Sequence, residues 1–214
     1  SEVTTPAIAS ALVRTWLAHE FDSERSISKV ARVRSLDPGR SGGMTDVAWV
    51  IGHGGIGSAV ARRLGRDHRV TTFDRRAGAD VPVDLCDAAA TVDALRRAPT
   101  PAIVVVAAGT VSPVEPGGDP DDIGRVIDDN LAALITLLGV LGELPPLRCA
   151  VIVSNAALVA RPRQPVYAAT KAAGVSLIRS TALAWGPRGS RIYGIAPGTV
   201  VVPRNADALT ARFL

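Results

Sequence analysis

The sequence predicts an α/β fold in which a doubly wound parallel sheet lies between two layers of helices. Three observations support this prediction. Short apolar runs alternate with segments of helical periodicity, a glycine-rich loop joins the first run to a helix, and later runs end in small or polar residues. Runs that are apolar throughout are typical of parallel strands, which are buried on both faces. The expected architecture is therefore a Rossmann-like, three-layer α/β/α sheet.

The expected elements follow one another with a single irregularity. Too few residues separate the second and third strands for a crossover helix, so one helix of the usual pattern is missing. The helix after the third strand has Asp87 as its N-cap and Val92 and Leu95 on its inner face. The expected strands span residues 47–51, 69–74, 81–85, 102–109, 149–154 and 191–196, and the expected helices follow the glycine loop and span 87–97, 121–141 and 167–185.

Both ends of the chain differ from this regular pattern. Residues 1–43 form an N-terminal arm or extension, with a helix expected near residues 5–21 and linker signals before Met44. Either this segment is a separate arm, or Met44 is the natural start and the segment is an upstream extension. Residues 44–214 are expected to form a single domain, with a C-terminus that is truncated soon after Pro203.

Composition argues against several classes of protein. No apolar run approaches the ~20 residues of a membrane span, and the start of the chain lacks a secretory signal. The arginines are scattered and aromatic residues are few, so the net charge of +4 is the only feature that favours a nucleic-acid binder. We therefore expect a cytoplasmic protein with neither membrane nor nucleic acid as a partner.

The two cysteines, Cys86 and Cys149, have neither a metal-binding spacing nor a disulfide framework. Both stand in largely apolar stretches of the sequence and are expected to be buried free thiols, as a reduced cytoplasm allows. No metal site is expected.

The chain turns from its first strand into its first helix through a glycine loop, Gly52-His53-Gly54-Gly55-Ile56-Gly57. This G-x-G-x-x-G pattern allows a tight turn and the close approach of a pyrophosphate to the helix N-terminus. Its position between a strand and a helix is the context that the motif requires. The loop therefore predicts a dinucleotide site, in which His53 is expected to point to solvent.

Asp74 ends the second strand, about 20 residues beyond the glycine loop. A carboxylate at this position accepts hydrogen bonds from the adenosine ribose and repels a 2′-phosphate, so NAD(H) is favoured. Arg75 and Arg76 follow directly, and either could bind that phosphate. NADP(H) therefore remains the alternative cofactor.

Tyr167 and Lys171 stand four residues apart in a predicted helix, so both side chains lie on one face. Each belongs to a type that occurs only twice in the chain, which makes a chance pairing improbable. A fixed cation beside a phenol lowers the phenol pKa and produces a general acid or base. Ser154 ends the fifth strand, thirteen residues before Tyr167, and Asn130 lies in an apolar helix, where a buried hydrogen-bonding role is expected. The alternative for the Tyr/Lys pair is a surface pair without function.

Taken together, these residues resemble the short-chain dehydrogenase/reductase family over residues 46–203. The matching positions are the glycine loop, Asp84-Leu85, Ala107-Ala108-Gly109 in place of the usual Asn-Ala-Gly, Asn130-Leu131, Ser154, Tyr167-x-x-x-Lys171 and Pro197-Gly198.

The resemblance implies the interconversion of a carbonyl and an alcohol by hydride transfer with a nicotinamide cofactor. It implies that Tyr167 donates or accepts the proton, that Lys171 lowers its pKa and holds the nicotinamide ribose, and that Ser154 polarises the substrate carbonyl. Asn130 would hold a water of a proton relay. A homodimer or homotetramer is expected. The implied cofactor-binding set is the glycine loop with Asp74, Arg75, Asp84, Leu85, Ala107, Ala108, Gly109, Tyr167, Lys171, Pro197, Gly198 and Val200.

Several positions depart from the family pattern. The glycine loop is one residue shorter than usual, the helix between the second and third strands is missing, and Val202 replaces a threonine that often contacts the nicotinamide. The usual substrate-loop helices and last strand are absent or replaced after Pro203. These departures leave one alternative open, a catalytically inactive NAD(P)-binding sensor or partner protein on the same fold.

Overall fold

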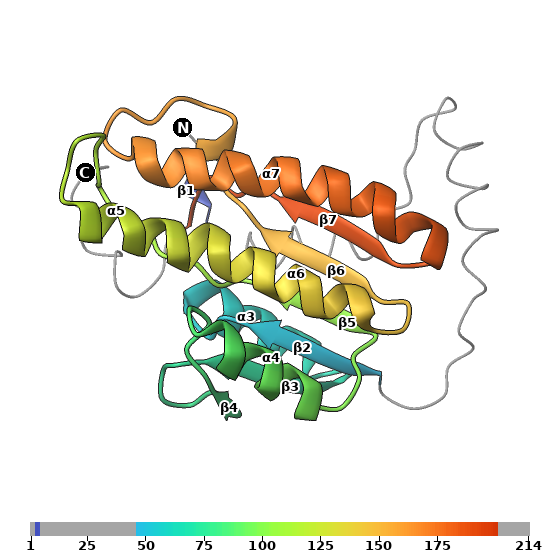
Figure 1. Ribbon diagram of the computed structural model, residues 1–214. Helices are drawn as coiled ribbons and strands as arrows, with labels where there is room; N and C mark the ends of the chain where they lie inside the picture. The colour runs from blue at the N-terminus through green and yellow to red at the C-terminus, as the bar shows by residue number, and fades with distance from the viewer. Residues whose placement is uncertain (1–2, 5–45, 201–214) are drawn as a thin grey trace.

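The computed structural model describes residues 3–4 and 46–200. Six strands of the second range form one parallel sheet in the order β4-β3-β2-β5-β6-β7 (Figure 1). The chain order reverses between β2 and β5, which is the switch point at which doubly wound sheets bind their ligands. The strands are β2 (Val47–Ile51), β3 (Arg69–Asp74), β4 (Val81–Pro82), β5 (Ile103–Val106), β6 (Arg148–Ile152) and β7 (Arg191–Ile195).

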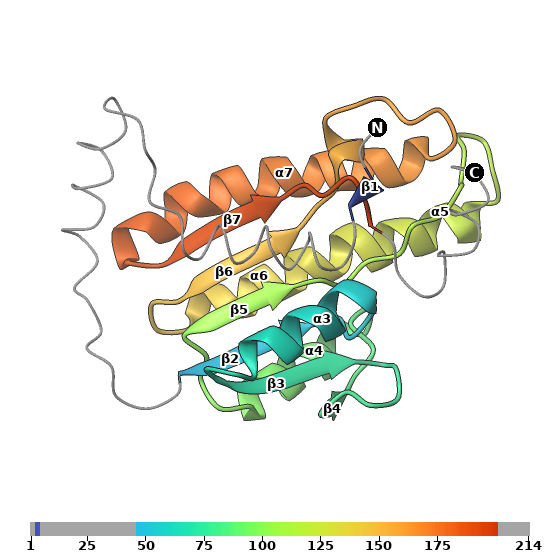
Figure 2. The same ribbon diagram turned by 180° about the vertical axis from the view of Figure 1, so that it is seen from behind.

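Helices cover both faces of this sheet, as expected for a three-layer α/β/α fold. One face carries α4, the pair α5 and α6, and α7, whereas α3 lies on the opposite face (Figures 1 and 2). The helices are α3 (Gly55–Leu64), α4 (Ala88–Arg97), α5 (Pro120–Ile127), the π-helical segment η1 (Asp128–Ala132), α6 (Ala133–Glu143), the 3₁₀ turn η2 (Asn155–Ala157), α7 (Pro165–Trp185) and the 3₁₀ turn η3 (Gly186–Arg188).

The alternation of side chains along the strands divides the core into two clusters. In β2, Trp49 and Ile51 face α4, α6 and α7, while Ala48 and Val50 face α3. Trp49 is fully buried, contacts Phe73 edge-on at a centroid distance of 5.2 Å, and donates its indole N–H to the Pro99 carbonyl at 2.9 Å. Burial on both sides explains why the strands are apolar throughout.

The connection from β3 to β4 contains no helix, as the sequence predicted. Asp80 holds this connection against β3, because its carboxylate accepts hydrogen bonds from both the backbone N–H and the hydroxyl of Thr72 at 2.8 Å. The third strand was predicted too long: it ends at Pro82 rather than at residue 85. Pro82 has no N–H for the ladder, and Asp84 turns the chain by accepting from the Cys86 N–H at 3.1 Å. Asp87 then caps α4 as expected, accepting from the Ala90 N–H at 2.9 Å.

The helix predicted over 121–141 is not a single α-helix. It begins at Pro120, after Asp119 as N-cap, and it widens into the π-helical segment η1 between α5 and α6. The buried Asn130 lies in this segment and donates to the Val126 carbonyl at 2.9 Å. A π-helical turn inside an α-helix is rare and occurs frequently at functional sites.

A short parallel pair lies apart from the main sheet. The strand β1 (Val3–Thr4) pairs with β8 (Thr199–Val200), with Val3 opposite Thr199 and Thr4 opposite Val200. The helix expected near residues 5–21, the linker before Met44 and the positions of Val202 and Pro203 lie outside the described residues. The boundary between an arm of 1–43 and a domain of 44–214 therefore stays a prediction.

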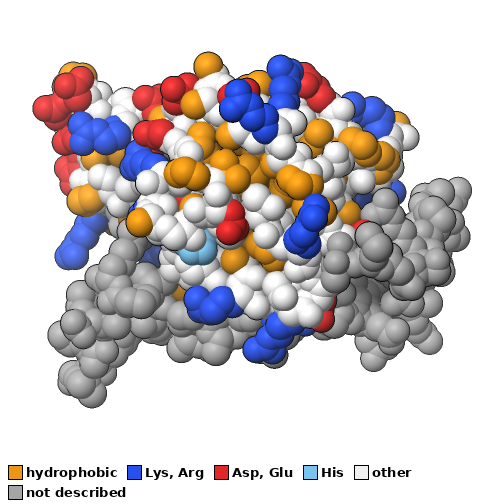
Figure 3. Space-filling view, turned by 90° about the horizontal axis from the view of Figure 1, so that it is seen from below, with side chains coloured by type: hydrophobic (Ala, Val, Ile, Leu, Met, Phe, Trp, Pro, Cys, Tyr) orange, Lys and Arg blue, Asp and Glu red, His pale blue; other side chains and the backbone are white. Residues whose placement is uncertain are grey.

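Two surface properties bear on possible partners. None of the helices in the described ranges is both long and apolar enough to cross a membrane. On the face shown in Figure 3, Lys and Arg side chains occur singly and in small groups among acidic and apolar side chains, without a continuous basic stripe. The expected lack of a nucleic-acid partner stays a prediction.

Truncating a leucine of this core should cost stability. Leu137 on α6 is 1% exposed, so Leu137→Ala should lower the free energy of unfolding by about 2–5 kcal/mol. The matched control is Leu183 on α7, which is 82% exposed, and Leu183→Ala should change the free energy by no more than about 0.5 kcal/mol. Urea unfolding followed by tryptophan fluorescence measures both, and equal losses would contradict the core assignment.

Candidate active site

An open groove with a volume of about 1200 Å³ runs along the carboxyl ends of the parallel strands. This volume exceeds the roughly 300–1000 Å³ of pockets for a single small ligand, so a dinucleotide and a substrate can share the groove. Two residues predicted for the site, Gly57 and Asn130, lie outside its lining. The predicted residues that line it are Gly52, His53, Gly54, Gly55, Ile56, Asp74, Arg75, Asp84, Leu85, Ala107, Ala108, Gly109, Ser154, Tyr167, Lys171, Pro197, Gly198 and Val200.

The glycine loop forms one end of the groove. Gly52 has a φ of +97°, and a Cβ on it would lie 2.4 Å from the backbone nitrogen of Ala108. A Cβ on Gly57 would lie 1.7 Å from the Gly52 carbonyl oxygen, so only glycine fits at position 57 in this turn. The following helix α3 has Gly54 as its N-cap, with no side-chain cap and no acidic residue in its first turn. Its free N–H groups can therefore donate hydrogen bonds to a pyrophosphate, and the loop fits a dinucleotide.

Asp74 is held against this loop by two backbone donors. Its carboxylate accepts from the His53 N–H at 2.6 Å and from the Arg76 N–H at 2.9 Å. The two arginines that follow Asp74 point to different partners. Arg75 forms ion pairs with Asp84 at 3.5 Å and Asp129 at 3.9 Å, whereas the Arg76 Nη1 lies 2.8 Å from the position of a Cβ on Gly54. Arg76 is therefore the arginine beside the phosphate-binding loop.

His53 does not simply point to solvent as predicted. The residue is half-buried, and its Nδ1 is buried without a hydrogen-bond partner among the described residues. The hydrogen bond from its backbone N–H to Asp74 holds the backbone of His53 against the end of β3.

Cys86 was expected to be buried, and this expectation is wrong. The thiol is exposed, lines the groove and donates to Asp129 at 3.1 Å, because the turn after β4 faces the groove. Partial burial and the Asp129 carboxylate raise the pKa of Cys86 to about 12. Cys149 is fully buried in β6, as expected, and burial raises its pKa to about 12.

Asn130 ties the loop after β5 to the helix. Its Nδ2 donates to the carbonyls of Thr110 at 2.8 Å and Val126 at 2.9 Å, and its Oδ1 accepts from the Thr110 N–H at 3.2 Å. The residue is 4% exposed, so its predicted buried hydrogen-bonding role is confirmed. Both amide hydrogens are engaged within the chain, and the remaining lone pair of Oδ1 is left for a further donor.

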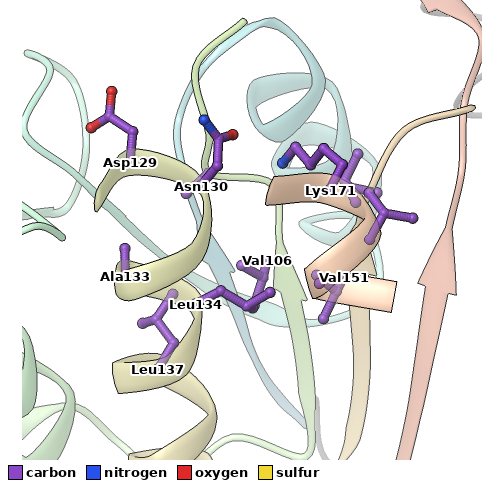
Figure 4. A pocket seen from close by; sticks show the side chains of 12 residues that line it. Val106, Asp129, Asn130, Ala133, Leu134, Leu137, Val151 and Lys171 are labelled. Atoms are coloured by element: carbon purple, nitrogen blue, oxygen red, sulfur yellow. The ribbon is translucent and has the colours of Figure 1, made fainter. Parts of the chain in front are cut away.

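Asn130 and Lys171 converge on Gly109. A Cβ on Gly109 would lie 2.6 Å from the Asn130 Oδ1 and 2.9 Å from the Lys171 Nζ. Figure 4 shows the Lys171 side chain extending toward the Asn130 amide, with apolar side chains of a small cavity below them and Asp129 directed away from the cavity. This cavity has a volume of about 10 Å³, which is enough for one water molecule.

Tyr167 and Lys171 lie on one face of α7, and both side chains are 7% exposed. The Lys171 ammonium lies 5.7 Å from the centre of the Tyr167 ring, which packs against Val126 and Ala156. Burial lowers the pKa of Lys171 to about 8. Tyr167 and Lys171 therefore share one poorly solvated space, unlike a surface helix pair.

Ser154 lies at the carboxyl end of β6 and lines the same groove as Tyr167. Its hydroxyl oxygen accepts from the Ala156 N–H at 3.1 Å, an interaction that caps η2. No acceptor within residues 46–200 takes the hydroxyl hydrogen, so it can donate to a ligand in the groove.

Several groove residues were not predicted as site residues from the sequence. Asp129 and Cys86 border the predicted Asn130 and Asp84-Leu85, and this adjacency is the signal that could have found them. Arg161 and Arg163 precede α7, and no motif marks them.

The sheet order and the strand–glycine loop–helix unit define a dinucleotide-binding α/β protein of the Rossmann type. Comparison with family models narrows this class. The model described as short chain dehydrogenase matches residues 79–212, which is more than half of the chain, and the protein belongs to this family. Family membership supports oxidoreductase chemistry with a nicotinamide cofactor.

Individual relatives share shorter or more distant similarity. An uncharacterized short-chain type dehydrogenase/reductase of Sinorhizobium fredii is 39% identical over 56 residues, which are 26% of this chain and only 10% of that protein. A 3-oxoacyl (acyl-carrier-protein) reductase of Agrobacterium tumefaciens, solved with NADP bound, is 26% identical with a TM-score of 0.71 over 78% of this chain and 74% of the other. A 4-hydroxyisoleucine dehydrogenase complexed with NADH is 22% identical, has a TM-score of 0.67 over 78% and 81% of the two chains, and shares the fold.

Burial of Lys171 should make the stability of the cofactor-free protein depend on pH. Its pKa is lowered from 10.5 to about 8 in the folded chain because burial disfavours the ammonium. Between these values the unfolded chain binds more protons, so the free energy of unfolding rises with pH. Near pH 7, Lys171→Met should therefore be more stable than the wild type, by up to roughly 3 kcal/mol at about 1.4 kcal/mol per pKa unit. This difference should shrink as the pH rises from about 8 to 10.5.

Denaturant unfolding across this pH range checks the expectation. The control variant is Arg179→Met, because Arg179 is exposed on the same helix, and its stability difference from the wild type should stay constant through the window. A constant difference for Lys171→Met as well would contradict the lowered pKa.

Proposed function

We propose that the protein interconverts a carbonyl and an alcohol with a nicotinamide cofactor, with Tyr167 as the general acid or base. The observation that carries this proposal is that Ser154, Tyr167 and Lys171 line one groove together with the glycine loop. Cofactor binding alone requires the loop but not a buried phenol beside a buried ammonium. The bound cofactor would supply or accept the hydride.

In the reducing direction, the chain's own residues would handle the carbonyl oxygen. The Ser154 hydroxyl, oriented by the Ala156 N–H, would donate a hydrogen bond to it. The Tyr167 hydroxyl would transfer its proton to the same oxygen as the carbonyl carbon gains the hydride, which yields the alcohol and leaves a phenolate. Lys171 would stabilise that phenolate, because a cation close to an anion in a poorly solvated site interacts strongly.

Asn130 would act on this chemistry mainly through position. Its amide holds Gly109 and Thr110 beside the Lys171 ammonium. The small cavity beneath the two side chains has room for the water of the proton relay that the family resemblance implies. Such a water could reprotonate the site after each turnover.

NAD(H) is the proposed cofactor, with NADP(H) as the alternative. The Asp74 carboxylate is fixed by the His53 and Arg76 N–H groups, and its remaining lone pairs suit the ribose hydroxyls. The Arg76 guanidinium beside Gly54 is the group that could bind a 2′-phosphate instead. Both cofactors occur among similar folds, since the acyl-carrier-protein reductase structure contains NADP and the 4-hydroxyisoleucine dehydrogenase structure contains NADH. A homodimer or homotetramer stays a prediction.

Replacing Tyr167 by phenylalanine should abolish turnover while preserving the fold. The ring that packs against Val126 and Ala156 is retained, and the hydroxyl that would donate the proton is removed. Carbonyl-dependent NADH oxidation over a panel of ketones should fall at least about a hundredfold, while NADH binding, measured by fluorescence titration, should persist. Full turnover by Tyr167→Phe would contradict the mechanism. A wild type that binds NADH but oxidises it with no ketone would instead favour the cofactor-binding sensor.

Removing the Asp74 carboxylate should shift cofactor preference toward NADPH. The ratio of the Kd for NADPH to the Kd for NADH should fall about tenfold or more in Asp74→Ala, since hydrogen bonds to charged groups contribute about 1.5–3 kcal/mol. Asp74→Asn keeps one acceptor oxygen but removes the negative charge. It therefore separates repulsion of the 2′-phosphate from hydrogen bonding to the ribose hydroxyls. Asp93→Ala, at an exposed site on α4, is the control. An unchanged ratio in both Asp74 variants would remove Asp74 from the ribose site.

A further inference from the structure

We infer that the substrate carries an anionic group, a carboxylate or a phosphate, and that Arg161 and Arg163 bind it. This inference rests on the proposed function, because it assigns the substrate end of the same groove. It names a class of carbonyl compound that neither the fold nor the family model specifies.

Position is the first support. Arg161, Arg163 and Gln164 all line the groove that contains Ser154 and Tyr167. The segment that carries both arginines is a defined turn, since the Gln164 N–H donates to the Arg161 carbonyl at 3.0 Å. Gln164 is also the N-cap residue of α7, and its carbonyl accepts from the Ala168 N–H at 2.9 Å. The turn is therefore anchored to the helix that carries the Tyr167 phenol.

Charge is the second support. The described carboxylates that line the groove are Asp74, Asp84 and Asp129. Asp74 accepts from two backbone N–H groups, and the other two pair with Arg75. Over the described ranges, no carboxylate forms an ion pair with Arg161 or Arg163.

The substrate end therefore combines a cationic wall with a reacting centre. Arg161, Arg163 and Lys171 line the same groove as Ser154 and Tyr167, and Val111 and Ala156 add apolar surface. Guanidinium groups form bidentate, charge-assisted hydrogen bonds with carboxylates and phosphates. A carbonyl compound whose anionic group meets these arginines would present its carbonyl to Tyr167 in a fixed orientation, which is the positioning that catalysis requires.

Matched pairs of ketones test this inference with the full chain. The carboxylate pairs are acetoacetate and levulinate, each with its methyl ester, and the phosphate pair is dihydroxyacetone phosphate with dihydroxyacetone. The wild type should prefer the anionic member of at least one pair by about tenfold or more in kcat/KM, as expected for a charge-assisted contact. This preference should decline as salt is raised, because ions screen exposed charges. The two kinds of pair distinguish a carboxylate from a phosphate.

Three variants identify the residues. Arg161→Gln and Arg163→Gln should lower the ratio of kcat/KM for the anionic over the neutral member, mainly through KM, and Arg161→Lys should restore part of it. Arg179→Gln makes the same charge change on the exposed side of α7, away from the groove, and should leave the ratio unchanged. Equal use of both members by the wild type, or an equal ratio in the groove variants and in Arg179→Gln, would overturn the inference.

Failure of the proposed function gives a different result. If no ketone supports NADH oxidation, the proposed oxidoreductase activity is wrong, and calorimetric titration of the NADH complex with the same pairs decides the anion site. Saturable binding of an anionic member, lost in the Arg161→Gln, Arg163→Gln double variant, would support the site. Equal binding of anionic and neutral members, or no binding of either, would overturn it.

Discussion

The close contact between the backbones at the carboxyl ends of β2 and β5 is the constraint on which the site depends. The three central strands stay hydrogen-bonded up to this point, since the Gly52 N–H donates to Phe73 and the Ala107 N–H donates to Ile51, each at 2.7 Å. There is no room for a Cβ between Gly52 and Ala108, so a glycine is required where the chain leaves the sheet. The backbone then turns sharply away, and the groove opens where the strand order reverses.

The other half of the site depends on a polar side chain inside the helix layer. Asn130 has its amide hydrogens bound to Thr110 and Val126, which fixes the loop after β5 against the π-helical segment η1. The same loop places Gly109 next to the Lys171 ammonium. Because burying an unpaired amide is costly, the hydrogen bonds of Asn130 make this arrangement of loop and helix more favourable than a regular helix with a free loop.

How far the sequence could predict this structure depends on the range of the interactions involved. The missing crossover helix and the Asp87 cap follow from local spacing and local hydrogen bonds, and both were predicted correctly. The π-helical segment was not, because it involves Asn130 and a partner twenty residues away, Thr110. The exposure of Cys86 was missed for the same kind of reason. The residues next to Cys86 in the sequence do not reveal that the turn after β4 faces the groove. The orientation of His53 is set by Asp74, which belongs to another strand.

The choice of lysine at position 171 follows from burial and not from charge alone. Arginine supplies nearly all the cations of this chain, but a guanidinium does not lose its proton in a protein. Burial lowers the pKa of Lys171 to about 8. The free-energy cost of burying the charged ammonium is therefore moderate, and loss of the proton removes this cost. Formation of an anion on the nearby Tyr167 would favour the ammonium again, since the two groups would then titrate as a coupled pair. Under the proposed mechanism, the same buried side chain would therefore affect both the stability of the resting protein and proton transfer by Tyr167.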